Sequence, residues 1–134
     1  LVYRDCAFLG EESVRASEAS ECADEQGKFW AYHDRLYDFI WDNYYAKNLN
    51  GENVGAFSEA NLKRLASETG LDEGKFALCL TSRRYQAEVE KDIADGRAAG
   101  VSGTPTTFVN GKIIVGAVPF SQFEVAIGEA LEKQ

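Results

Sequence analysis

The sequence predicts an α/β or α+β fold in which a run of helices lies between a short N-terminal strand and a C-terminal β-hairpin with a closing helix. Three observations predict this order. Residues 1–4 are apolar and β-prone, residues 11–99 carry helix-favouring segments, and residues 106–115 form two short apolar runs separated by Asn-Gly. The chain has 134 residues and no internal repeat or linker, so we expect one domain's worth of structure.

The first half of the chain is predicted to be helical after the opening strand. Residues 1–4 are consistent with a strand that ends at Asp5. Residues 11–23 are small, charged and helix-favouring, and residues 26–45 carry apolar side chains at helical spacings. These apolar positions form a broad aromatic stripe on one helix face: Phe29, Trp30, Leu36, Tyr37, Ile40, Trp41 and Tyr44.

Capping residues divide the helices that follow. Ser58 is the predicted N-cap of a helix over 58–69, and Asp72 is the predicted N-cap of a short helix over 72–80. Residues 82–99 are predicted to form another helix, because apolar residues recur in it at a spacing of four.

The C-terminal segment carries the strongest local signal. Strands are predicted over 106–109 and 112–115, joined by Asn110 and Gly111, which suit the two positive φ angles of a type I′ turn. Pro119 suits the first turn of a closing helix. The apolar face of that helix is predicted to consist of Phe120, Phe123, Ile127 and Leu131.

Composition excludes several classes of function. Lys and Arg number 14 against 22 Asp and Glu, and the net charge of −8 argues against nucleic acid or an anionic membrane as a partner. No apolar run approaches the roughly 18 residues of a membrane span. One His and no Gly-rich nucleotide motif predict neither a metal nor a cofactor. The chain contains no Met, so we expect a processed or truncated product whose signal segment is not in this sequence.

One motif, together with the order of elements, resembles a known family. Residues 100–111 are Gly-Val-Ser-Gly-Thr-Pro-Thr-Thr-Phe-Val-Asn-Gly. This segment resembles the DsbA-like branch of the thioredoxin superfamily, and so do residues 2–5, 21–23, 26–30 and 115–117. The resemblance covers essentially the whole chain.

The resemblance implies a thioredoxin-like fold with an inserted helical domain. Residues 1–9 and 101–134 would form the thioredoxin part, and residues 10–100 the helical insert. The family's chemistry uses a C-x-x-C pair at a helix N-terminus, where the helix dipole stabilises the thiolate. The three cysteines here are 16 and 57 positions apart, so we predict no catalytic residue in this chain and expect the β-α unit that carries the pair to be missing. An upstream piece, a second chain, a rearranged first strand or a swapped dimer would fill its place.

The resemblance also implies a set of site residues. It places a cis Thr104–Pro105 peptide bond in a loop that contacts substrate polypeptide, so Gly103, Thr104 and Pro105 are the predicted substrate-binding residues. The alternative is an ordinary trans proline entering a strand. It further places Cys22 and Cys79 together in the helical insert, where some family members have a disulfide; the alternative is two buried thiols.

Other conspicuous residues have simpler interpretations. Cys6 is expected to pack against the core, and His33 to be a partly exposed helix histidine. The aromatic stripe is first of all predicted core, while its outer members could line a groove for unfolded polypeptide. The carboxylates early in the chain are expected to form a solvated helix face: Glu11, Glu12, Glu18, Glu21, Asp24 and Glu25.

The predicted function is therefore the bulk of a DsbA-like thiol-disulfide oxidoreductase acting on protein cysteines, inactive as this chain alone. Its expected partners are a cysteine-containing polypeptide and either a complementing N-terminal segment or a second copy. The expected location is periplasmic or otherwise extracytoplasmic. The alternative is a non-enzymatic DsbA-like module that binds polypeptide or self-associates.

Overall fold

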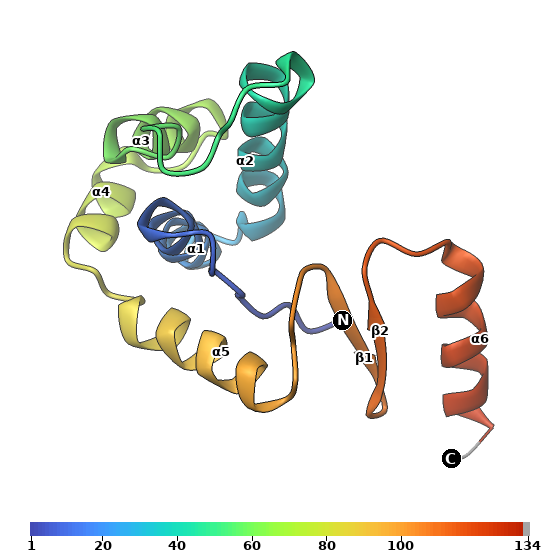
Figure 1. Cartoon of the computed structure of the whole chain (residues 1–134). Coiled ribbons are helices and arrows are strands. Elements are labelled where there is room, and N and C mark those ends of the chain that lie inside the picture. The colour runs from blue at the N-terminus through green and yellow to red at the C-terminus, as the bar shows by residue number, and fades with distance from the viewer. Residues whose placement is uncertain (133–134) are drawn as a thin grey trace. The chain divides into compact units, whose positions relative to one another are not determined.

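The computed structural model describes residues 1–132 (Figure 1). Residues 133 and 134, the last two of the predicted 101–134 segment, lie outside the described residues. The chain divides into two compact units, Leu1–Ala94 and Asp95–Gln134. The boundary between them falls within a continuous helix, α5.

The first unit consists of helices that follow the predicted ones closely. They are α1 (Glu11–Asp24), α2 (Phe29–Asn43), the 3₁₀ turn η1 (Tyr45–Lys47), α3 (Glu59–Glu68), α4 (Glu73–Thr81) and the greater part of α5 (Gln86–Ala98). Helix α1 packs against α2, α3 and α4, so it lies at the centre of this unit. Its small buried residues, such as Ala19 and Ala23, allow the neighbouring helices to approach closely.

Only some residues of the predicted aromatic stripe of α2 are buried in the core of the first unit. Leu36 and Ile40 are buried in the core, as predicted. Trp30, Tyr37 and Trp41 are exposed, so the prediction that they are core is wrong. The predicted stripe was too wide for one buried face, because a helix in a bundle of this size buries only the side that meets its neighbours.

Backbone turns set the ends of the helices. Asp72 caps α4 as predicted, since its carboxylate accepts a hydrogen bond from the Lys75 N–H at 2.9 Å. Ser58 occupies the N-cap position of α3, but its side chain makes no capping hydrogen bond within residues 1–132. Helix α5 begins at Gln86, later than predicted, because the chain turns at Arg83 with a φ of 54°.

The predicted N-terminal strand is absent from residues 1–9, and that prediction is wrong. A strand needs a neighbour for its backbone groups, and in the described residues the strands at 106–109 and 112–115 pair with each other and not with this segment. The segment is held by Asp92 of α5 instead. The carboxylate of Asp92 accepts hydrogen bonds from the Arg4 guanidinium at 2.8 Å and from the Asp5 N–H at 3.2 Å.

The second unit contains the predicted hairpin and closing helix. Strands β1 (Thr106–Val109) and β2 (Lys112–Val115) pair antiparallel. The turn residues Asn110 and Gly111 have φ angles of 46° and 84°, as a type I′ turn requires. Helix α6 (Phe120–Leu131) follows, and the predicted order of helices, hairpin and helix is confirmed.

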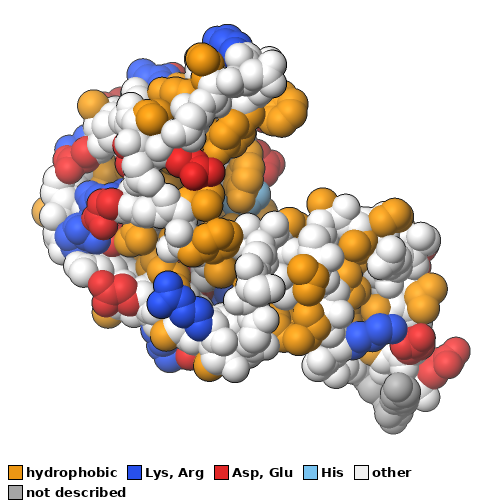
Figure 2. All heavy atoms as spheres, viewed as in Figure 1, with side chains coloured by type: hydrophobic (Ala, Val, Ile, Leu, Met, Phe, Trp, Pro, Cys, Tyr) orange, Lys and Arg blue, Asp and Glu red, His pale blue; other side chains and the backbone are white. Residues whose placement is uncertain are grey.

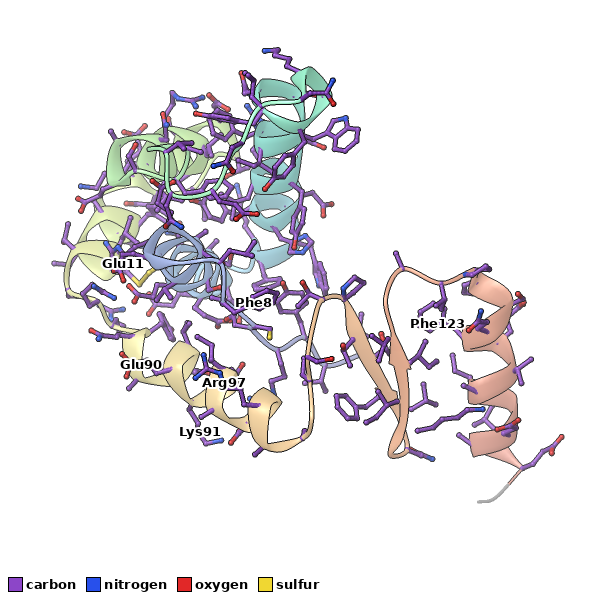
Figure 3. The ribbon with its side chains drawn as sticks, in the orientation of Figure 1. Phe8, Glu11, Glu90, Lys91, Arg97 and Phe123 are labelled. Atoms are coloured by element: carbon purple, nitrogen blue, oxygen red, sulfur yellow. A yellow bond between two sulfur atoms is a disulfide. The ribbon has the colours of Figure 1, made fainter. Side chains whose placement is uncertain are left out.

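Helix α6 packs against the hairpin but buries little of its apolar surface. Phe123 projects from α6 on the side of the hairpin (Figure 3), and Ala126 is buried. The apolar face predicted for this helix is largely exposed, because a two-stranded hairpin covers only part of it. The exposed members are Phe120, Ile127 and Leu131.

Candidate functional site

The predicted substrate loop is anchored to the hairpin at both of its ends. The Thr104–Pro105 peptide bond is cis, as the resemblance implies. The Thr106 hydroxyl donates a hydrogen bond to the Gly103 carbonyl at 2.6 Å, and the Gly116 N–H donates one to the Pro105 carbonyl at 2.7 Å. These two bonds fix the loop from before and after the cis peptide.

The backbone of Thr104 is available for a binding partner. Thr104 and Pro105 are exposed, and Gly103 is half-buried. Within residues 1–132, no hydrogen bond engages the Thr104 N–H or its carbonyl. An exposed, unengaged peptide group of this kind can pair with an extended polypeptide.

Strand β1, which follows the loop, has an open edge. In the described residues it pairs only with β2, through the register from Thr106 opposite Val115 to Val109 opposite Lys112. The unpaired edge presents backbone donors and acceptors that a further strand could satisfy. The loop and this edge are therefore continuous as a surface for main-chain pairing.

The predicted disulfide between Cys22 and Cys79 is present. It joins α1 to α4, with the two Cα atoms 5.9 Å apart and both residues only 1% exposed. A disulfide so deeply buried is shielded from attack by an external thiolate. Its role in the first unit is to hold the core together, because it closes a chain segment of 57 residues.

Beside the disulfide, Glu18 forms a buried ion-pair network. The Glu18 carboxylate, 1% exposed, accepts hydrogen bonds from Arg15 at 2.5 Å and from Arg83 at 2.7 and 3.1 Å. Arg15 also donates to the Leu80 carbonyl at 3.0 Å. The prediction of a solvated face is therefore wrong at Glu18, and the two guanidinium groups compensate its burial.

A second group of carboxylates lies where the N-terminal segment meets α1 and α5. Burial raises the pKa of Glu21 to about 7, and the negative charges of Asp5 and Glu88 add to the rise. Burial also raises the pKa of Asp5, partly offset by a hydrogen bond with Ser17. The solvated-face prediction is thus wrong for Glu21 too, because the N-terminal segment covers it. No cluster of metal-ligating side chains was found in residues 1–132.

A cluster of aromatic rings surrounds His33 on the outer side of α2. Ring centroids in this cluster lie 4.7 to 5.9 Å apart. Its members are Tyr3, Phe29, Trp30, His33 and Tyr37. His33 is partly exposed, as predicted, and its Nδ1 lies 3.0 Å from the Asp34 carboxylate. Burial raises the pKa of Tyr3, and its neighbour Tyr37 adds to the effect. Helical spacing alone predicts that the four cluster members from α2 lie near one another. Only the structure places Tyr3 among them.

Cys6 differs from its prediction. Its neighbours Asp5 and Ala7 are buried, but Cys6 itself is half-buried and forms no disulfide within residues 1–132. It lies at the margin of the first unit and not in its core cluster. The alternation of buried and half-buried residues follows from the extended course of the chain here.

The family of the chain follows from its sequence and fold together. A family model described as "DSBA-like thioredoxin domain" matches residues 4–128. The chain therefore belongs to the DSBA-like thioredoxin domain family, and its fold is thioredoxin-like with mostly helical content and a small two-stranded sheet. The resemblance of residues 100–111 is confirmed.

A solved structure also has this thioredoxin-like fold. A thioredoxin-like oxidoreductase from Silicibacter pomeroyi DSS-3, known from its crystal structure, superposes with a TM-score of 0.74 at 29% identity. The match covers 98% of this chain and 68% of that chain.

Curated relatives include two sodium/proton antiporters. Na(+)/H(+) antiporter NhaA 1 of Salinispora arenicola is 31% identical over 115 residues, covering 86% of this chain. NhaA 3 of Salinispora tropica is 35% identical over 97 residues, covering 72% of this chain. The matched parts are 16% and 13% of those relatives' lengths. None of the helices in residues 1–132 has the length and hydropathy needed to span a bilayer.

Proposed function

We propose that this chain is the substrate-facing and helical part of a DsbA-like thiol-disulfide oxidoreductase that acts on cysteines in polypeptides. One observation carries the proposal. The exposed peptide group of Thr104 makes no hydrogen bond within residues 1–132, so it is available to pair with an extended substrate chain. The chain that presents it belongs to the DSBA-like thioredoxin domain family, and a thioredoxin-like oxidoreductase shares its fold.

The redox step needs a reactive cysteine pair on the enzyme in addition to the two cysteines of the substrate. A substrate thiolate attacks the enzyme disulfide, forming a mixed disulfide and releasing one enzyme thiolate. The second substrate thiolate then attacks the mixed disulfide, which leaves an oxidised substrate and a dithiol enzyme that has gained two electrons. In this scheme, the backbone of Thr104 holds the substrate while the exchange takes place.

The cysteines of this chain do not suit that step. Cys22 and Cys79 are buried, and Cys6 has no partner thiol for the second attack. The proposal therefore includes a complementing segment, upstream of Leu1 or in another chain, that supplies C-x-x-C and a strand for the open edge of β1. Residues 1–9 and 101–134 belong with that segment in the thioredoxin part, and residues 10–100 form the helical insert.

The buried disulfide also supports a location. Disulfides persist in oxidising compartments, so the proposed location is periplasmic or otherwise extracytoplasmic. In cells quenched with acid and then denatured without reductant, Cys22 and Cys79 should remain unlabelled by a thiol reagent, whereas labelling of both would contradict the proposal.

The test compares two proteins in oxidation of a dithiol peptide and reduction of insulin. One is this chain of 134 residues, and the other carries the reading frame upstream of Leu1 as well. We expect activity only in the longer protein. Lack of activity in a longer protein that contains C-x-x-C would contradict the proposal. A reading frame that starts at a Met directly before Leu1 would favour the non-enzymatic, polypeptide-binding or self-associating module.

A control separates the two possible sources of exchange. The double variant Cys22→Ala/Cys79→Ala of the longer protein should keep its activity under conditions where it remains folded. If activity is instead present in the 134-residue chain and lost in its double variant, then the buried disulfide is the redox pair and the proposal fails.

A further inference from the structure

Helix α2 presents three large aromatic side chains to solvent on one side. Trp30, Tyr37 and Trp41 are 50%, 61% and 61% exposed. Their spacings of seven and four residues place them on one side of the helix. Figure 2 shows hydrophobic side chains gathered over α2, with the histidine among them. Several exposed rings gathered on one side of a helix form an apolar patch, and such a patch marks an interaction surface.

A row of carboxylates runs beside these rings. Asp34, Asp38 and Asp42 recur every four residues and therefore lie about 6 Å apart along the helix. Asp34 is next to His33, and within residues 1–132 neither Asp38 nor Asp42 forms an ion pair. We call the combined surface the aromatic–acidic face of α2; it consists of Trp30, Asp34, Tyr37, Asp38, Trp41 and Asp42.

Part of this face is held in place before any partner arrives. The His33 ring lies 5.3 Å from that of Trp30 and 4.7 Å from that of Tyr37. The opposite side of α2 is fixed in the core by Leu36 and Ile40. A surface whose rings are already packed loses less conformational entropy on binding.

We propose that the aromatic–acidic face binds a cationic polypeptide segment in an extended conformation. Charge complementarity selects Lys and Arg side chains, which pair with the carboxylates and pack over the rings as cation–π contacts. The chain already contains one such contact, since the Arg64 guanidinium lies 5.2 Å from the Phe39 ring centroid. Alternate side chains of an extended chain are about 6.6 Å apart, close to the spacing of the carboxylates.

The probe is a set of three labelled ten-residue peptides of alternating sequence, Lys-Thr, Ser-Thr and Glu-Thr. Binding to the 134-residue chain is measured by fluorescence anisotropy at 20 and 300 mM NaCl. We expect the Lys-Thr peptide to bind about tenfold more tightly than the Ser-Thr peptide at low salt. Salt screens exposed charges, so the advantage should shrink at 300 mM NaCl. The Glu-Thr peptide should not bind.

Charge variants test the role of the carboxylates. Asp38→Asn/Asp42→Asn should weaken binding of the Lys-Thr peptide about fivefold. The matched control Glu124→Gln/Glu132→Gln also removes two negative charges, but from exposed positions in α6 and at its end. It should change binding less than about twofold. Equal losses in the two double variants would mean attraction by net charge alone and would overturn the proposal.

Ring variants test the aromatic contribution. Trp41→Ala should weaken binding about fivefold, while Trp41→Phe should retain most of the affinity because a ring remains. Leu78→Ala, at a residue that is 64% exposed on α4, is the matched control and should bind like the parent. Circular dichroism and the unfolding midpoint check that each variant is folded.

Other occupants give distinct results. Equal binding of the Lys-Thr and Ser-Thr peptides would indicate a purely apolar surface and would overturn the proposal. A dimer in sedimentation that Trp41→Ala abolishes would assign the face to a second copy and would overturn it too. The proposal is independent of the redox function: a longer protein without oxidase activity would leave peptide binding unchanged.

Discussion

The two units of this chain bury their apolar side chains to very different degrees. In residues 1–94, Leu62, Leu65 and Leu80 are fully buried beside a disulfide. In residues 95–132, Ile114 and Ala126 are the buried hydrophobic residues. The exposed ones include Phe108, Ile113, Val115, Phe120 and Val125.

This difference shows what each unit needs in order to be stable. The first unit has helices packed around a closed core, so burial of its own apolar side chains stabilises it against unfolding. A hairpin with a single helix is close to the limit of independent stability. The second unit therefore gains the most from whatever pairs with the open edge of β1, which is the place of the proposed complementing segment.

The largest expected effect comes from the disulfide. Removing it in Cys22→Ala/Cys79→Ala should lower the free energy of unfolding of the first unit by about 4 kcal/mol, because the closed segment spans 57 residues. Urea unfolding followed by tryptophan fluorescence measures this. Amide signals of the β1–β2 hairpin, followed by NMR, should be unchanged in native buffer; their loss would show that the units are not separable in this way.

A matched pair of leucines tests the contrast in burial. Leu65→Ala removes a side chain that is 0% exposed and should lower the free energy of unfolding by about 3 kcal/mol. Leu131→Ala removes one that is 64% exposed on α6 and should cost less than about 0.5 kcal/mol. Chemical denaturation of both variants gives the comparison. Similar losses would mean that α6 is covered in solution.

The buried Glu18 network gives the next effect. Glu18→Gln leaves Arg15 and Arg83 without their carboxylate and should cost about 2 kcal/mol, because partial exposure of Arg83 lets water relieve some of the loss. Lys63→Gln, which breaks a half-exposed pair with Glu59 and does not touch the Glu18 network, should cost no more than about 0.5 kcal/mol. Equal unfolding midpoints for the two variants would show that the Glu18 network contributes nothing specific.

Local rules predicted the elements of this fold well. The Asn110–Gly111 turn and the Asp72 cap depend on neighbouring residues only, so the sequence contains all that is needed to place them. The motif at residues 100–111 likewise predicted the family and the cis peptide at Pro105.

Contacts between distant segments were not predictable in this way. Glu18 is buried because Arg83, far along the chain, turns back over it. Residues 1–4 form no strand because no strand of residues 1–132 pairs with them. The aromatic cluster needs Tyr3 to meet α2, and nothing local in the sequence indicates that encounter.

The smallest effect concerns pH and sharpens the picture of the N-terminal segment. The pKa of Glu21 is raised to about 7 in the folded protein, chiefly by burial and then by Asp5 and Glu88. Between about pH 4.5 and 7, the folded state holds a proton that the unfolded state has lost, so stability falls as pH rises. Glu21→Gln mimics the protonated form. It should leave stability unchanged at pH 4.5 and raise it by about 1 kcal/mol at pH 8, after allowance for solvent screening of a partly exposed group.

Glu25 provides a control of opposite sign. Hydrogen bonds from Arg84 and Tyr85 lower its pKa, so its stabilising effect is present above its ordinary pKa and is lost only in acid. Glu25→Gln should therefore lower the unfolding midpoint at both pH 6 and pH 8. Glu21→Gln should raise it more at pH 8 than at pH 6. A Glu21→Gln variant with the parent's pH profile would mean that the N-terminal segment does not cover Glu21 in solution. Its anchor at Asp92 would then be too weak to hold residues 1–9 on the helical unit.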